Sequence, residues 1–177
     1  DIPDSADVEY VYDGLMHLGA TIAIDTIKLI ASKLPEDNLD VDFSHVLDEI
    51  SVPQEQENIE LKSAPKIFKE TCEINWSQPA KTIYNFVRGL SPFPGAWTSI
   101  DLNDGSESKS LVMKIYKTSK TNRAATGTVG SLVVEKNRLY VNTTDNLLEL
   151  LDIQLSGKKR MDAASFLNGF KAITDYH

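Results

Sequence analysis

Hydrophobic residues recur at two different periods along this chain. Across residues 8–32 they return every three or four positions, which predicts one long helix with an apolar face. That face comprises Val8, Val11, Tyr12, Leu15, Gly19, Ile22, Thr26 and Ile30. After residue 95 apolar and polar positions alternate instead, which is the period of a strand with one buried side. The pattern therefore predicts an N-terminal helix followed by a β-domain.

The stretch 64–102 connects these two parts and predicts a short helix followed by a proline-rich turn. Ser77 is the candidate N-cap, because its hydroxyl can accept a hydrogen bond from the first helical turn. Pro79 suits that first turn, where its missing N–H is not needed. The residues expected on the apolar face are Ile83, Phe86, Val87 and Leu90. The sequence of residues 91–95, Ser-Pro-Phe-Pro-Gly, cannot continue a helix.

Strands are predicted near residues 96–100, 111–116, 127–135, 138–142 and 151–155. The turn signals between them are Asn103-Asp104-Gly105, Lys136-Asn137 and Asp145-Asn146, with Asn137 expected to adopt positive φ. Glu149 interrupts the alternation, which indicates a bulge or an edge position. Asp162 is expected to cap a last helix carrying Phe166, Leu167 and Phe170. Five short strands with small helices fit a small barrel of the OB or the SH3-like type.

Composition describes an ordinary water-soluble protein, with 41% hydrophobic and 25% charged residues among 177. No apolar run is expected to reach the length of a membrane span, and the start at Asp1 indicates a piece of a longer protein. The net charge of −8 divides unevenly, with −12 on residues 1–63 and +4 on residues 64–177. This asymmetry leaves a polyanionic partner possible for the second part.

Side chains suited to catalysis or metal binding are sparse. His17, His45 and His177 lie far apart in the sequence and lack zinc-ligand spacing, so no metal site is predicted. Cys72 follows no disulfide pattern and precedes Glu73, whose charge disfavours a reactive thiolate. No catalytic residue is predicted. Trp76, Phe86, Phe93 and Trp97 are expected to pack in the core or an interface rather than to stack on bases.

Three collinear blocks resemble the methionyl-tRNA formyltransferase family. KIFKE…INW…IYNFVRGLSPFPGAWT is similar to the start of its C-terminal domain, YDGLMHLGA to the helix that closes its catalytic domain, and GKKRMDAASFLNG to its C-terminal signature. The resemblance implies an α+β chain: an N-terminal helix and linker, then an OB-like five-stranded Greek-key β-barrel with short helices. It implies that residues 1–33 are the last helix of a truncated N-terminal Rossmann-like domain, residues 34–63 an acidic linker and residues 64–177 the C-terminal OB-like barrel domain.

The resemblance also implies a function for the parent enzyme, a cytoplasmic transferase. That enzyme moves a formyl group from 10-formyltetrahydrofolate to the amine of initiator methionyl-tRNA, and its catalytic residues lie in the N-terminal domain. This fragment would therefore bind no cofactor and be inactive alone. It is expected to bind the tRNA as a monomer without membrane contact, and its 8–32 helix is expected to pack against the missing catalytic domain.

Basic residues of the second part are the candidate tRNA contacts, because a phosphate backbone needs cations placed along a path. Lys66, Lys69, Lys158 and Lys159 match family motifs, and the others follow from charge and strand phase. The full set is Lys66, Lys69, Arg88, Lys114, Lys117, Lys120, Arg123, Lys158, Lys159 and Arg160. Two alternatives stay open: a different formyltransferase, acting on a sugar nucleotide or on formyltetrahydrofolate, and a purely structural barrel.

Overall fold

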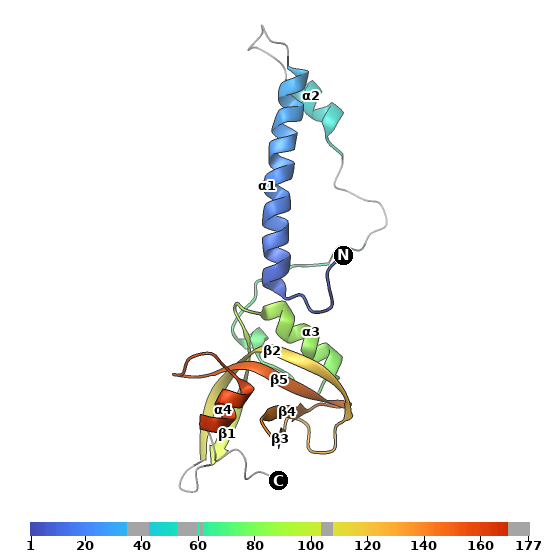
Figure 1. Cartoon of the computed structure of the whole chain (residues 1–177). Helices are drawn as coiled ribbons and strands as arrows, with labels where there is room; N and C mark the ends of the chain where they lie inside the picture. Colours follow the sequence, from blue (N-terminus) through green and yellow to red (C-terminus); the bar gives the residue numbers. More distant parts are fainter. Residues whose placement is uncertain (35–42, 53–59, 61, 104–107, 170–177) are drawn as a thin grey trace. The chain divides into compact units, whose positions relative to one another are not determined.

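A computed structural model describes residues 1–34, 43–52, 60, 62–103 and 108–169 (Figure 1). The chain forms two compact units: Asp1–Val11 together with Ile67–His177, here called the sheet unit, and Tyr12–Lys66, here called the helical unit. The elements are α1 (Val8–Lys33), α2 (Phe43–Ile50), η1 (Glu70–Cys72), α3 (Ala80–Leu90), β1 (Ala96–Asn103), β2 (Ser108–Ala124), β3 (Leu132–Glu135), β4 (Arg138–Asn142), β5 (Asn146–Leu155), β6 (Met161–Asp162) and α4 (Ala163–Gly169).

Helix α1 has the predicted extent, but its apolar residues are not confined to one face. Leu18, Ile24 and Ile27 lie off the predicted face, and no residue of α1 is buried. A helix that is apolar around much of its circumference is normally covered by other protein or by lipid. Of the helices in the described residues, α1 alone has the length and mean hydropathy that would allow it to cross a membrane. The expectation that no segment reaches that length is therefore wrong, although core helices of soluble proteins share these properties.

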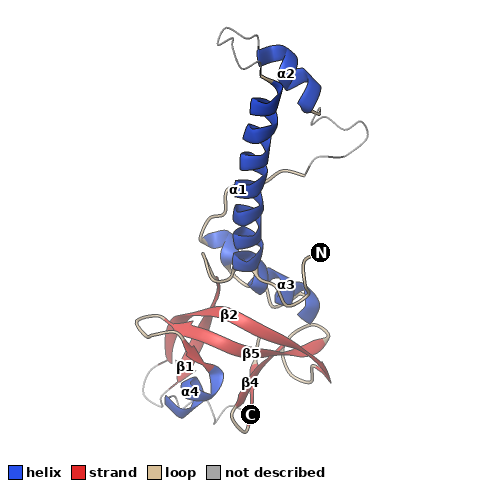
Figure 2. Ribbon diagram, turned by 45° about the horizontal axis from the view of Figure 1, so that its top comes forward, coloured by secondary structure: helices blue, strands red, loops and turns tan. Residues whose placement is uncertain are grey.

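The strands form one antiparallel sheet in the order β1-β2-β5-β4-β3, with β6 paired to the end of β5. Figure 2 shows β1, β2, β5 and β4 of this sheet. Strands β3, β4 and β5 are consecutive neighbours, and β2 returns to lie beside β5, which is the Greek-key order. The α+β class is confirmed. The five-stranded barrel is not confirmed: within the described residues the sheet has six strands, and no hydrogen bonds pair β1 with β3 to close it.

Helix α3 buries the face that the sequence predicts. Ile83, Val87 and Leu90 are buried, and they meet Met113, Ile115 and Ile153 of the sheet in one hydrophobic core. The cap is different from the one expected. The Ala80 N–H donates to Asp145 Oδ1 at 2.8 Å, so a carboxylate from the β4–β5 turn satisfies the first helical turn in place of Ser77. This long-range bond ties α3 to the sheet.

A buried amide shortens the third predicted strand. Asn142 is fully buried, and its Oδ1 accepts hydrogen bonds from the backbone N–H groups of Thr126 and Gly127 at 3.1 and 3.0 Å. Its Nδ2 donates to Ser131 Oγ at 2.9 Å. Residues 126–131 are thus held as a loop around this side chain, and β3 begins only at Leu132. The predicted strand over 127–135 is therefore wrong in its first half.

Two other local predictions are corrected by the sheet. In the β3–β4 hairpin Lys136, not Asn137, adopts positive φ at 55°. Glu149 lies neither at an edge nor at a bulge, since it pairs with Tyr140 of β4 on one side and Ser119 of β2 on the other. The pairing of β2 with β5 shifts register at Ile115/Lys117, Lys117/Thr118 and Lys120/Ala124. At the second of these the extra residue is Leu151 of β5, two positions after Glu149.

The last helix begins as predicted. Ser165 N–H donates to Asp162 Oδ1 at 2.7 Å, and Phe166 and Leu167 are buried in the core. The hydrogen bonds that the Asp162 carboxylate accepts from Ser165 lower the pKa of Asp162. The predicted turn at Asp104-Gly105 and the apolar position Phe170 lie outside the described residues.

Candidate nucleic-acid interface

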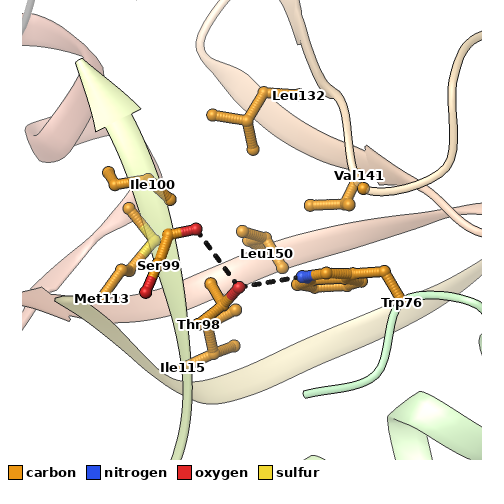
Figure 3. Close-up of a pocket in the computed structure, with 10 residues that line it drawn as sticks. Trp76, Thr98, Ser99, Ile100, Met113, Ile115, Leu132, Val141 and Leu150 are labelled. Carbon is orange, nitrogen blue, oxygen red and sulfur yellow. Dashed lines mark hydrogen bonds between the residues drawn. The ribbon is translucent and has the colours of Figure 1, made fainter. Parts of the chain in front are cut away.

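The space between β1 and β3 is filled by Trp76, which approaches from the segment before α3. Its indole N–H donates to Thr98 Oγ1 of β1 at 3.0 Å (Figure 3). On the other side, Gly130 brings the loop before β3 against the ring: a Cβ at Gly130 would lie 3.6 Å from Trp76. A cavity of about 70 Å³ remains beside Trp76, and Met113, Val141 and Leu150 contribute to its apolar lining. Since its lining holds no titratable side chain, we assign it no acid–base chemistry.

The outer face of β1, β2 and β5 carries a row of aromatic and cationic side chains. Trp97 lies opposite Lys114, and Lys114 lies opposite Gln154, so the three side chains share one face of the sheet. Lys69 adds a second cation, with its Nζ 5.9 Å from the centroid of the Trp97 ring, while the Trp97 indole N–H donates to the Lys69 carbonyl at 2.8 Å. We call Lys69, Trp97, Lys114, Tyr116 and Arg160 the aromatic–cationic band.

Tyr116 and Arg160 continue this band toward β6. The guanidinium of Arg160 lies 4.2 Å from the centroid of the Tyr116 ring and binds Asp152 Oδ2 at 2.6 Å. Burial raises the pKa of the Tyr116 hydroxyl, which donates to Gln154 Oε1 at 2.7 Å. The hydrogen bond to Asp152 raises the pKa of Arg160, so its charge is permanent but already partnered.

Three candidate lysines carry exposed ammonium groups. Lys158 and Lys159 lie in the turn between β5 and β6, and Lys117 lies at the register shift of β2. In the part of the chain that the structure describes, none of the three forms an ion pair. The turn itself is fixed, because Lys158 N–H donates to the Leu155 carbonyl at 2.9 Å and Gln154 Nε2 donates to the Lys158 carbonyl at 2.9 Å. These charges are available to a polyanion.

Two other candidates bind the N-terminal segment of the sheet unit. Lys120 Nζ forms an ion pair with Asp4 Oδ2 at 2.5 Å and lies 4.7 Å from the Tyr84 ring centroid. Arg88 Nη1 donates to the Ala6 carbonyl at 2.8 Å, and Ala6 is buried. The hydrogen bond from Lys120 lowers the pKa of Asp4. Both cations therefore have an intramolecular role.

Two arginines, Arg138 of the β3–β4 hairpin and Arg123 of the adjacent β2, are neutralised by neighbouring acids. Arg123 makes two hydrogen bonds to Glu135, which raise the pKa of Arg123 and lower the pKa of Glu135. Arg138 binds both carboxylate oxygens of Glu149 at 2.7 and 3.1 Å. Both guanidinium groups face the Tyr140 ring, at 4.9 and 5.9 Å from its centroid.

Sequence reasoning overlooked Arg138. Its role follows from Glu149, whose side chain is only 8% exposed and is buried in the sheet next to this guanidinium. An acid that breaks the apolar alternation of a strand was the signal, because a buried carboxylate requires a cationic partner. The hydrogen bond from Glu149 raises the pKa of Arg138.

The ten predicted residues thus fall into different surroundings. Lys69, Lys114 and Arg160 belong to the band; Lys117, Lys158 and Lys159 are exposed without an ion pair in the described residues. Arg88 and Lys120 hold the N-terminal segment, and Arg123 is paired with an acid. Lys66 is exposed and belongs to the helical unit.

No metal centre is found among the described residues, which hold no cluster of three or more His, Cys, Asp or Glu side chains. Cys72 is buried, with its Sγ 3.2 Å from the Phe68 carbonyl, whereas His17 and His45 are exposed. The third histidine, His177, lies outside the described residues.

Comparison with known proteins places this geometry in a family. Residues 66–171 match the formyl transferase C-terminal domain. This chain belongs to that family. It is 42% identical to a methionyl-tRNA formyltransferase of Parabacteroides distasonis over 99% of the chain and 50% of the relative. It is 40% identical to the protein of that name from Bacteroides fragilis, over 96% of the chain and 48% of the relative. The chain thus spans about half the length of these curated relatives.

Among solved structures, the chain is similar to HypX from Aquifex aeolicus, whose crystal structure is a complex with tetrahydrofolic acid. The TM-score is 0.49 at 17% identity, covering 72% of this chain and 22% of HypX. Similarity at this level supports no functional argument for the formyltransferase domain.

Proposed function

We propose that this chain is the C-terminal, tRNA-binding part of a methionyl-tRNA formyltransferase. The observation that carries the proposal is the 40–42% identity, over nearly the whole chain, to proteins of that name. The intact enzyme would transfer a formyl group from 10-formyltetrahydrofolate to the amine of initiator methionyl-tRNA in the cytoplasm. In this assignment residues 1–33 form the last helix of the catalytic domain. Residues 34–63 link it to residues 64–177, which form an OB-like RNA-binding scaffold.

The surface chemistry supports a polyanionic ligand. Lys117, Lys158 and Lys159 offer exposed charges, and the band places Lys69 and Lys114 beside aromatic rings. Cations of this kind position a nucleic acid through its phosphates, whereas selectivity for one tRNA needs additional base or shape contacts. The chain would thus contribute affinity and orientation, and the part of the enzyme outside it would contribute the chemistry.

The exposed apolar residues on several sides of helix α1 fit the same assignment. Leu18, Ile24 and Ile27, which are exposed, would be buried against the catalytic domain. The chain covers 50% of the relative from Parabacteroides distasonis, and the remaining half has room for such a domain. We infer that the chain acts as a monomer and that no formyl donor binds to it by itself.

The proposal is tested by titrating initiator tRNA into the chain at several salt concentrations. We expect weak binding whose logarithm falls linearly with the logarithm of the salt concentration, because bound cations release counterions from the phosphates. Mixing the chain with 10-formyltetrahydrofolate and methionyl-tRNA should yield no formylmethionyl-tRNA. Absence of salt-dependent binding would contradict the tRNA role and favour a structural module, whereas formylation by the chain alone would contradict the proposed division of labour.

A further inference from the structure

The turn after α3 holds an aromatic ring out in solvent. Phe93 is 82% exposed, whereas its neighbour Ser91 is buried. The sequence suggested the opposite, that Phe93 packs in the core or an interface. An isolated exposed apolar residue is common on protein surfaces. What makes this one unusual is the rigidity of the backbone that carries it.

Several contacts fix this turn. Pro92 and Pro94 restrict φ on both sides of Phe93. The Gly95 N–H donates to the Leu90 carbonyl at 2.8 Å, and Lys114 Nζ donates to the Pro94 carbonyl at 2.9 Å. The backbone of the turn is thus tied at both ends, and the ring that it carries lies in solvent. The ring is therefore presented to solvent at little further conformational cost for a ligand that binds it.

The turn also lies directly against the aromatic–cationic band. Gly95 has φ +84, and a Cβ there would lie 3.2 Å from Tyr116 Cε1 and 3.5 Å from Lys114 Cδ. Tyr116 in turn stacks with Arg160. The turn that carries Phe93 thus adjoins a band that contains cations. A protein partner that buried this ring would need a wider apolar surface, whereas a nucleic acid offers a flat base next to phosphates.

We propose that Phe93 is a stacking platform for one unpaired nucleobase of the bound RNA, while the exposed Lys69 of the neighbouring band contacts an adjacent phosphate. The inference rests on the proposed tRNA-binding function and adds to it a specific kind of contact. Stacking on an aromatic side chain is tolerant of base identity, because every base has a π-face. The contact therefore distinguishes unpaired RNA from duplex rather than one sequence from another.

A blunt RNA duplex and the same duplex with an unpaired 3′ extension test the proposal on this chain. The extension should tighten binding by about five- to 150-fold, the range for one stacked base. Phe93→Ala should remove that gain and leave the affinity for the blunt duplex unchanged. Phe93→Trp should keep the gain, whereas Phe93→Leu, which retains apolar bulk without a ring, should abolish it.

Tyr10→Ala is the matched control, because Tyr10 is another exposed aromatic of the sheet unit, at 57%. It should leave both affinities unchanged. A fluorescent 2-aminopurine in the extension supplies a second readout, since stacking on Phe93 should change its emission in the parent chain and not in Phe93→Ala.

Two results would overturn the inference: no gain from the extension, or a gain that survives Phe93→Ala. In both cases salt-dependent binding of the blunt duplex would leave the proposed function intact. Failure of the proposed function is separate, because neither probe nor initiator tRNA would then bind with salt dependence.

Discussion

The β5–β6 turn and the β3–β4 hairpin both carry basic side chains, but the surrounding residues use them differently. At the hairpin, Arg138 and the adjacent Arg123 of β2 flank Tyr140 and bind Glu149 and Glu135. At the turn, Lys158 and Lys159 project into solvent. Equal formal charge therefore has unequal consequences: a paired guanidinium stabilises the sheet, whereas an exposed ammonium is available to a phosphate. Substitutions should separate the two regions, affecting stability at one and RNA binding at the other.

The largest effect should come from the exposed turn. Replacing Lys158 and Lys159 together by Ala should cost about 1–3 kcal/mol of RNA-binding free energy for each charge-assisted hydrogen bond to a phosphate that the change removes. The slope of the salt dependence should fall by roughly one for each lysine. Titrations of initiator tRNA at several salt concentrations measure both quantities. The melting temperature should stay constant, and unchanged binding would remove these two lysines from the interface.

Next in size is a substitution on the hairpin side that should change stability alone. Asn142→Ala empties a buried side-chain position and removes the acceptor of the Thr126 and Gly127 N–H groups. The free energy of unfolding should fall by about 2–4 kcal/mol in urea denaturation. Ser131→Ala removes only one partner of the same amide and should cost about 1 kcal/mol. If the two variants are destabilised equally, the amide is not the centre of this loop.

A smaller effect is expected at the carboxylate that caps α3. Asp145→Ala should lower the free energy of unfolding by about 1 kcal/mol at neutral pH. The Ala80 N–H and the Thr143 hydroxyl lower the pKa of Asp145 below its ordinary 3.8. Its stabilisation is therefore fully present above pH 3.8 and disappears as the pH falls through the lowered value.

Asp145→Asn is the matched variant for the pH effect, because it keeps an oxygen acceptor but cannot titrate. Urea midpoints between neutral pH and about pH 3 should fall less steeply for Asp145→Asn than for the parent chain. Parallel curves for both proteins would show that the charge of Asp145 makes no contribution to acid sensitivity.

The smallest effect should follow from a cation that is already paired. Arg123→Gln removes a guanidinium that is bound to Glu135 and lies over Tyr140. Since exposed pairs of this kind contribute little, initiator tRNA affinity should change by less than about twofold. A decrease as large as that of the two lysines would show that Arg123 exchanges Glu135 for a phosphate when RNA binds.

The sequence by itself determined those features that depend on neighbours along the chain. The period of apolar residues located α1 and α3, the alternation located most strands, and Asp162 marked the start of α4. The chain also carried its own family signature, because the three motif blocks lie in order along it. Local propensity and side-chain period are sufficient for each of these.

Only the tertiary structure decided how distant residues meet. Asp145 caps α3 from 65 positions away, Asn142 shortens β3, and Arg138 neutralises Glu149 across two strands. The fixed turn that exposes Phe93 depends in the same way on Lys114 of β2. Hydrogen bonding and burial act between groups that are close in space, and spacing along a single sequence does not specify which groups those are. The availability of each cation was therefore settled by its neighbours in the fold rather than by its place in the chain.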